Sequence, residues 1–168
     1  MIYILVPTFA RVKETKAFLS SINQSIKHDY LAIIIDDHPQ KETLKNIEQN
    51  NNLNIFPSEK ELWWVGSINM GIQILLDKYD LKDQDVVVFA NNDIQIDKNS
   101  FELLYNELKK NITQIVHPRT FDQKGNEVSS GAKIISFLPY ITKHPKDFTK
   151  EKEAIDMGTA RFLMMGGS

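Results

Sequence analysis

The chain contains no cysteine, which excludes disulfide bonds and thiolate metal sites. It also lacks a long apolar run, because no stretch approaches the roughly 20 residues that cross a bilayer. Lysine and arginine number 20 against 22 acidic residues, so the net charge is −2 and gives no electrostatic reason to bind nucleic acid or an anionic membrane. Residues 1–7 carry no basic leader and no small-residue cleavage site. We therefore expect a cytoplasmic protein, with peripheral attachment to the inner face of the membrane left open.

The composition, with 42% apolar and 25% charged residues, is typical of one ordinary globular domain, which we expect to span residues 1–168. Short apolar runs alternate with stripes of helical period, which predicts a Rossmann-like α/β fold with a mainly parallel sheet flanked by helices. A short antiparallel hairpin is expected at 121–128, around Gly125. The remaining strands are expected at 2–6, 30–35, 53–56, 85–90, 114–117 and 131–137, and the helices at 14–26, 41–50, 65–79 and 98–110.

The most informative stretch is the apolar run 86–89 followed by Asn91, Asn92 and Asp93. Four consecutive β-branched or aromatic residues predict a strand covered on both faces, at the centre of the sheet. A carboxylate beside two amides at a strand end could hold a divalent cation and the phosphates it bridges. The alternative is that these residues only turn the chain, since Asn and Asp cap turns well.

Two more strands end in polar side chains. Thr8, Phe9 and Arg11 follow the first strand, and Asp36 and Asp37 follow the second. If the strands are parallel, all three clusters project from the same edge of the sheet, where open α/β folds bind ligands. Acidic oxygens can accept hydrogen bonds from a ribose or a base, and a guanidinium can meet phosphate. The alternative for the acidic pair is a solvated turn or a cap for the next helix.

Four segments, in this order, resemble family 2 glycosyltransferases. Residues 6–11 are similar to a Val-Pro-Thr-Tyr-Asn-Arg opening, and 33–37 to the strand end that binds the nucleotide. Residues 63–72, with paired Trp, small residues and Asn, resemble the rhamnosyltransferase-like branch. Residues 89–93 occupy the place of the Asp-x-Asp motif, and 130–134 add weaker similarity. The resemblance implies the GT-A fold, a nucleotide-diphospho-sugar donor and Mg²⁺ or Mn²⁺.

The resemblance also implies roles for individual residues. Asp93 takes the place of the metal ligand, and Asp37 is favoured for the base. Adjacent side chains on an extended segment point opposite ways, so one of Trp63 and Trp64 is expected in the core. The nucleotide-binding residues are expected to be Pro7, Thr8, Phe9, Arg11, Asp36, Asp37, Asn91 and Asn92, and those near the donor sugar or diphosphate Trp64, Gly66, Ser67 and Asn69.

Two departures from the family pattern matter. The first position of Asp-x-Asp is the neutral Asn91, which makes metal dependence less strict. The family places its catalytic base after a segment like 159–165, and no Asp or Glu follows Asp156. We therefore expect the base beyond Ser168, in a longer enzyme of which this chain is the N-terminal part, and a chain that binds nucleotide but transfers sugar poorly.

The predicted function is inverting, metal-assisted transfer of a hexosyl group to a hydroxyl of a glycan or lipid-linked acceptor, in cell-surface glycan synthesis. One alternative is a catalytically silent module that binds nucleotide-sugars. A second is a receiver-like signalling domain, which would need its acidic pair after the first strand, where Pro7 and Thr8 stand instead. The sequence does not report the donor, the acceptor or the oligomeric state.

Overall fold

The computed structural model describes residues 1–97, 99–110, 115–122, 124–129, 133–137 and 140–143. The chain divides after residue 98 into two compact units, and each is described by itself. Segments 130–132 and 159–165, which the sequence analysis singled out, lie outside the described residues.

The first unit is built on a four-stranded, fully parallel sheet in the order β3-β2-β1-β4. Register is set by β1, because Thr8 pairs with Asp36 of β2 and Leu5 with Phe89 of β4. The predicted α/β class with a mainly parallel sheet is confirmed. The strands are β1 (Ile2–Thr8), β2 (Tyr30–Asp36), β3 (Leu53–Pro57) and β4 (Val86–Phe89).

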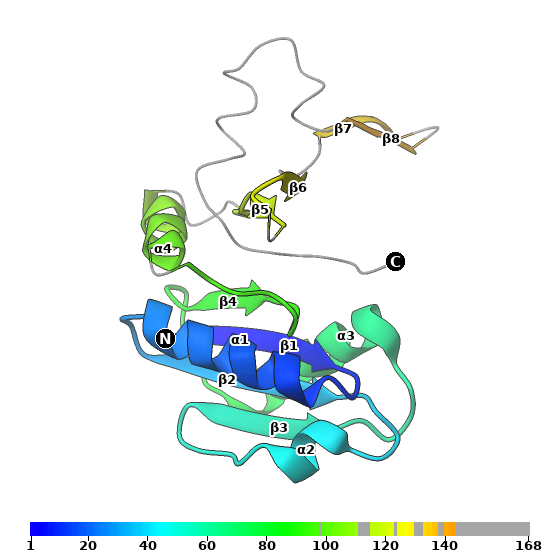
Figure 1. Cartoon of the computed structure of the whole chain (residues 1–168). Helices are drawn as coiled ribbons and strands as arrows, with labels where there is room; N and C mark the ends of the chain where they lie inside the picture. The colour runs from blue at the N-terminus through cyan, green and yellow to red at the C-terminus, as the bar shows by residue number, and fades with distance from the viewer. Residues whose placement is uncertain (98, 111–114, 123, 130–132, 138–139, 144–168) are drawn as a thin grey trace. The chain divides into compact units, whose positions relative to one another are not determined.

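Three helices connect these strands: α1 (Val12–Ser25), α2 (Glu42–Asn46) and α3 (Trp63–Lys78). Figure 1 shows α1 crossing the near face of the sheet, with all four strand arrows pointing the same way. The predicted helix 41–50 is wrong in length, because Ile47 is already extended and Asn50 bridges to Leu53. None of the helices in the described part of the chain has the length and apolarity that a membrane span requires.

The core of this unit follows from the alternation of side chains along β1 and β2. Odd-numbered residues such as Leu5 and Ile33 form one buried cluster with Ile68 and Leu75 of α3. Even-numbered residues such as Ile34 are equally buried and belong to the opposite face. α3 approaches β1 closely, since a Cβ added at Gly71 would lie 3.2 Å from the Leu5 side chain. Both faces of the two middle strands are therefore covered.

In the sheet formed by the described residues, the strand predicted at 85–90 is at the edge and not at the predicted central position. Among the described residues, β4 pairs only with β1 and is the last strand of the sheet, while β1 and β2 are the central strands. Its Val87 is 41% exposed, although the run Val86–Phe89 is entirely apolar. A short apolar run has the same composition at an edge as at the centre, so composition could not decide the position.

The second unit contains α4 (Ser100–Lys110) and two antiparallel strand pairs. The predicted hairpin is confirmed: β5 (Thr120–Phe121) pairs with β6 (Glu127–Ser129), and Gly125 turns the chain with φ +83°. Asp122 fixes this turn by accepting hydrogen bonds from the amides of Lys124 (2.9 Å) and Asn126 (2.8 Å). The second pair joins β7 (Lys133–Phe137) to β8 (Tyr140–Lys143).

The central and edge strands should respond differently to truncation. We expect Ile33→Ala, at a fully buried position, to lower the free energy of unfolding by about 2–5 kcal/mol. Val87→Ala on the exposed strand should lower it by less than about 1 kcal/mol. Urea unfolding of both variants measures the difference, and equal losses would contradict the assigned edge position.

Asp85, just before β4, gives the fold a dependence on pH. Its carboxylate accepts a hydrogen bond from the Lys82 amide and lies 2.9 Å from the Met1 ammonium. The Lys82 bond, then the Met1 bond, lower the pKa of Asp85 below its ordinary value of 3.8, against an opposing effect of burial.

A lowered pKa in the folded state means that the ionised Asp85 stabilises the fold above its unfolded pKa. This contribution is lost as the pH falls through the folded pKa. Unfolding measured from about pH 5 down to pH 2 should therefore show a smaller acid-induced loss for Asp85→Asn than for wild type. Parallel stability curves for the two proteins would remove Asp85 from this account.

Candidate functional site

The loops that leave β1, β2 and β3 share an unusual backbone. Each contains one non-glycine residue in the left-handed region: Ala10 (φ 55°), Lys41 (φ 54°) and Trp63 (φ 58°). No other non-glycine residue among those described has positive φ. Because the strands are parallel, all three loops lie at the carboxyl edge of the sheet, the edge where the sequence predicted the polar clusters after β1, β2 and β4. Strained backbone of this kind clusters at ligand sites when the surroundings enforce it.

The loop after β1 presents two exposed side chains above a buried one. Pro7 is half-buried within β1, and Thr8 is buried, its hydroxyl 2.9 Å from that of Thr43. Phe9 is 47% exposed and meets the His38 ring edge-on at 4.8 Å. The guanidinium of Arg11 reaches across to Asp93. Phe9 and Arg11 are therefore placed where a ligand could touch them.

Asp36, at the end of β2, is fully buried and used by the fold. Its carboxylate accepts hydrogen bonds from the backbone amides of His38 (3.3 Å) and Leu44 (2.9 Å). Leu44 lies in the first turn of α2, so the predicted alternative of a helix cap is what the structure shows for Asp36. Its proposed contact with a nucleotide stays a prediction.

Asp37 is nearly as buried, at 4% exposure, and caps a different helix. One carboxylate oxygen accepts from the Ser58 hydroxyl at 2.8 Å, and both oxygens accept from the Leu62 amide at 2.9 Å. The second oxygen also accepts from the Trp63 amide at 2.8 Å. A carboxylate therefore already sits at the positive end of α3, where helix dipoles favour negative charge. Whether Asp37 contacts a base is left open by this geometry.

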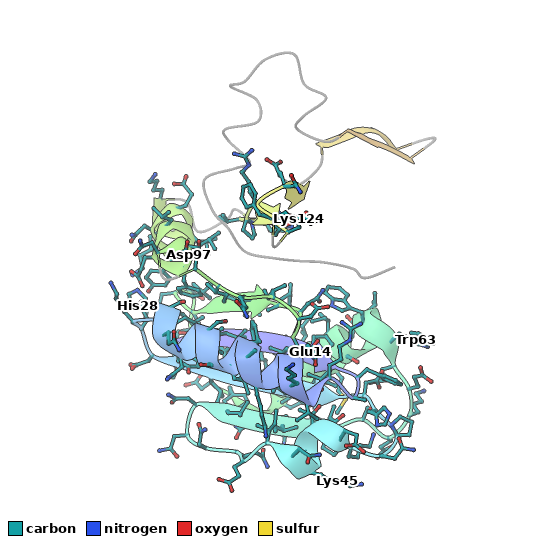
Figure 2. All side chains as sticks on the ribbon, viewed as in Figure 1. Glu14, His28, Lys45, Trp63, Asp97 and Lys124 are labelled. Carbon is teal, nitrogen blue, oxygen red and sulfur yellow. The ribbon has the colours of Figure 1, made fainter. Side chains whose placement is uncertain are left out.

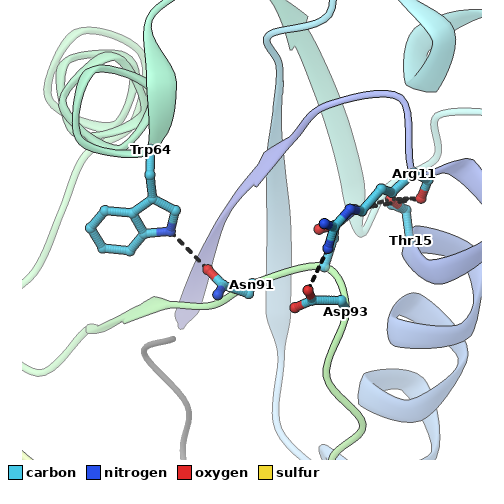
Figure 3. Close-up of polar contacts among 6 residues, drawn as sticks. Arg11, Thr15, Trp64, Asn91 and Asp93 are labelled. Carbon is cyan, nitrogen blue, oxygen red and sulfur yellow. Dashed lines mark hydrogen bonds and ion pairs between the residues drawn. The ribbon is translucent and has the colours of Figure 1, made fainter. Parts of the chain in front are cut away.

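The paired tryptophans at the start of α3 point in different directions. Trp64 packs against the core cluster, and its indole N–H donates to the Asn91 side-chain oxygen at 2.8 Å (Figure 3). Trp63 is 75% exposed and projects from the side of the sheet where the strands end (Figure 2). Of the two, Trp64 is the one that packs against the core, and it is partly buried there.

Packing within the protein explains part of the choice of small residues at the start of α3. A Cβ on Gly66 would come within 2.9 Å of Leu62, so this position requires glycine for reasons inside the helix turn. Ser67 is fully buried, and its hydroxyl has no hydrogen-bond partner among the described residues. Asn69 is exposed. Their predicted roles at the donor sugar or diphosphate remain proposals.

The segment after β4 is tied to the loop after β1. Asp93 accepts a hydrogen bond from the Arg11 guanidinium at 2.6 Å, with both side chains about half exposed (Figure 3). Asn92 is buried and donates to the Thr15 hydroxyl at 2.9 Å. Asn91 is the partner of Trp64. Each member of this triplet therefore has a protein partner, and only Asp93 carries charge.

This donor set fits a divalent cation only in part. Within the described residues, no three acidic, His or Cys side chains gather into a metal cage. Mg²⁺ is commonly held by one or two carboxylates together with substrate phosphates and water. Asp93 supplies one such carboxylate once Arg11 releases it, with the amide oxygen of Asn91 nearby in sequence. The fit is thus to a cation that arrives with a diphosphate.

Sequence reasoning missed two features of this edge. Lys41 donates from its ammonium to the Ser58 carbonyl, which places a cation beside the acidic pair. The 75% exposure of Trp63 is the second, because the sequence predicted only that one member of the tryptophan pair lies in the core. Nothing in the sequence distinguishes the two tryptophans, and no motif points to Lys41.

The two acids at this edge should differ in their effect on stability. Asp37→Ala removes the shared acceptor of one buried hydroxyl and two part-buried amides, so we expect a loss of roughly 2–4 kcal/mol. Asp93→Ala removes one exposed ion pair, and such pairs contribute only about 0–1 kcal/mol. Thermal melts with matched urea titrations compare them; a large loss in Asp93→Ala would make that residue structural.

Comparison with known families bears on the whole chain. Residues 3–166 match the model of the family described as glycosyl transferase family 2. No curated protein matched the chain in a direct search. The match spans nearly the full length and agrees with the parallel α/β sheet, which is consistent with the GT-A fold. It also sets the chain apart from the receiver-like alternative. The chain belongs to glycosyl transferase family 2.

Proposed function

We propose that this chain holds a nucleotide-diphospho-sugar at the carboxyl edge of its sheet and serves an inverting hexosyl transfer in cell-surface glycan synthesis. The observation that carries the proposal is the convergence of three loops at this edge, with Arg11 and Asp93 in contact although 82 residues separate them. The paired tryptophans and small residues at the start of α3 support a donor like that of the rhamnosyltransferase-like branch.

Charge is arranged for a diphosphate along this edge. Arg11 is 58% exposed at its side chain and offers a planar guanidinium, which matches phosphate oxygens in a bidentate way. Its present partner Asp93 is also exposed, so the pair can exchange with solvent or ligand at little cost. We propose that Arg11 meets the diphosphate. The rest of the proposed nucleotide site is Pro7, Thr8, Phe9, Asp36, Asp37, Asn91 and Asn92.

A divalent cation, Mg²⁺ or Mn²⁺, is proposed to accompany the donor, with Asp93 as its protein carboxylate. When bound, such an ion supplies neutralising charge to the departing nucleoside diphosphate. Because Asn91 is neutral and bonded to Trp64, the protein contributes fewer charged ligands than an Asp-x-Asp motif would. The proposed dependence on the cation is correspondingly modest.

In the proposed reaction, a hydroxyl of the glycan or lipid-linked acceptor attacks the anomeric carbon from the face opposite the diphosphate. The bond from that carbon to the phosphate oxygen breaks, and the nucleoside diphosphate leaves with the electron pair. A carboxylate base takes the hydroxyl proton. No described residue is assigned to this base. Arg11 stabilises the charge that develops on the leaving oxygens, as preorganised cations do.

Titration calorimetry with UDP, dTDP and GDP, each with and without Mn²⁺, tests the proposal. We expect at least one of them to bind the folded protein, and to bind more tightly with Mn²⁺. If a folded sample binds none of the three under either condition, the proposed donor site is wrong.

Asp93→Ala should remove the increase in affinity that Mn²⁺ gives, because the protein then has no carboxylate in this triplet. We expect nucleoside diphosphate binding in Mn²⁺ to weaken by roughly tenfold or more, in keeping with the ~1.5–3 kcal/mol of a charge-assisted contact. Asp77→Ala is the matched control, since Asp77 is an exposed acid near the far end of α3. Equal affinities of Asp93→Ala and wild type would remove Asp93 from the site.

A further inference from the structure

We propose that Trp63 is a nucleobase-stacking residue, which forms an aromatic wall beside the end of β2. This inference rests on the donor site proposed above and adds a contact that determines which end of the edge receives the base. It is carried by the exposure of Trp63, its backbone conformation, and its place relative to Asp37 and Phe9.

Exposure is the first part of the evidence. Trp63 is 75% exposed. Among the described residues, the next most exposed aromatic side chains are Phe9 at 47% and Phe121 at 40%. Burying a tryptophan is one of the larger gains available to a fold, and Trp63 forgoes it. Its neighbour Trp64 packs against the core and bonds to Asn91, so the sequence pair is divided between structure and surface.

The backbone of Trp63 is the second part. A φ of 58° is unusual for a bulky side chain, and it persists only where the surroundings enforce it. Here the Asp37 carboxylate supports this backbone conformation by accepting hydrogen bonds from the amides of Leu62 and Trp63. A buried carboxylate thus holds the strained backbone of a residue whose indole is exposed. A ligand that contacts the indole gives this arrangement a purpose.

Topology supplies the third part. β2 lies between β1 and β3, and Asp37 follows its end. Phe9 comes from the loop after β1, two residues from Arg11, and Trp63 comes from the connection after β3. The Asp37 amide donates to the Thr8 carbonyl at 2.9 Å, while its carboxylate accepts from Trp63. Two exposed aromatic residues therefore originate on either side of one buried acid.

The order of charged and aromatic residues along the edge favours the base over the sugar as the group that contacts Trp63. Arg11 and Asp93, the charged pair suited to a diphosphate, join the loops after β1 and β4. Phe9 and Trp63 lead from the loops after β1 and β3, on the other side of β1. A nucleotide-sugar has its flat aromatic group at one end, its diphosphate in the middle and its sugar beyond. With the diphosphate at Arg11, the aromatic end lies toward Asp37 and Trp63.

The substitution series compares Trp63→Ala, Trp63→Phe and Val65→Ala by calorimetry with UDP, dTDP, GDP and pyrophosphate. Alanine at 63 should weaken the nucleoside diphosphate that wild type binds best by about tenfold, as expected for a lost base–aromatic stack. Phenylalanine should keep affinity within about threefold, because it retains a stacking face. Val65→Ala, at a 65% exposed position in the same turn, should match wild type.

Pyrophosphate separates stacking from a change in the shape of the loop. It has no base, so its affinity should be the same in Trp63→Ala as in wild type. A fluorescence titration that compares wild type with Trp63→Phe should show quenching by the nucleoside diphosphate that depends on Trp63, and no such quenching with pyrophosphate. Because Trp63 is exposed, melting temperatures of its variants should stay close to that of wild type.

Each other result has a defined meaning. If wild type and Trp63→Ala bind a nucleoside diphosphate equally, the stacking role is overturned while the donor site stands. If Trp63→Ala weakens pyrophosphate as much as nucleotide, Trp63 acts on the loop and the stacking role is again overturned. If it weakens a nucleotide-sugar but not the matching nucleoside diphosphate, the indole serves the sugar instead. If wild type binds no nucleotide, the proposed function itself fails.

Discussion

The Asp37 carboxylate is the interaction on which the arrangement of this edge depends. It accepts hydrogen bonds from Ser58 after β3 and from Leu62 and Trp63 at the start of α3, while its own amide bonds to Thr8 of β1. The side chain of Asp37 therefore ties the end of β2 to the connection between β3 and α3, and its backbone amide ties the same point to the end of β1. Buried charges are costly unless they are fully hydrogen-bonded, and Asp37 meets that condition through backbone and hydroxyl donors.

This role changes what the acidic pair can be expected to do for a ligand. Asp36 and Asp37 are both buried and both satisfied by groups of the protein, so they act first as caps for α2 and α3. Phe9, Arg11, Trp63 and Asp93 are among the side chains left exposed at the same edge. In the proposed site the acids set the geometry of the loops, and aromatic and charged groups carried by those loops meet the donor.

The ion pair Arg11–Asp93 lies on the β4 side of β1, whereas Asp37 lies on the β2 side. It joins the loop after β1 to the turn after β4 through an exposed ion pair, the kind of contact that a charged ligand can replace. Below it, Asn92 and Trp64 make neutral hydrogen bonds that hold the turn in place. An exposed ion pair that can exchange, next to neutral hydrogen bonds that hold the turn, suits a site that must accept and release a diphosphate.

Much of this architecture could be predicted from the residues alone. Apolar runs with polar ends indicated parallel strands, the helical stripes indicated their connections, and the edge where Thr8, Asp37 and Asp93 would meet followed from both. The prediction of an antiparallel hairpin around Gly125 was also correct. These features depend on local pattern and on the short range of turn chemistry, and they do not need knowledge of what packs against what.

Only the tertiary structure decided how those residues are used. The run 86–89 fits a central strand or an edge, and pairing placed β4 at the edge of the described sheet. Trp63 and Trp64 are the same residue type side by side, and in the structure the first is exposed while the second is partly buried against the core. Composition determines which groups reach the edge, whereas long-range hydrogen bonds determine which of them stay free to meet a ligand.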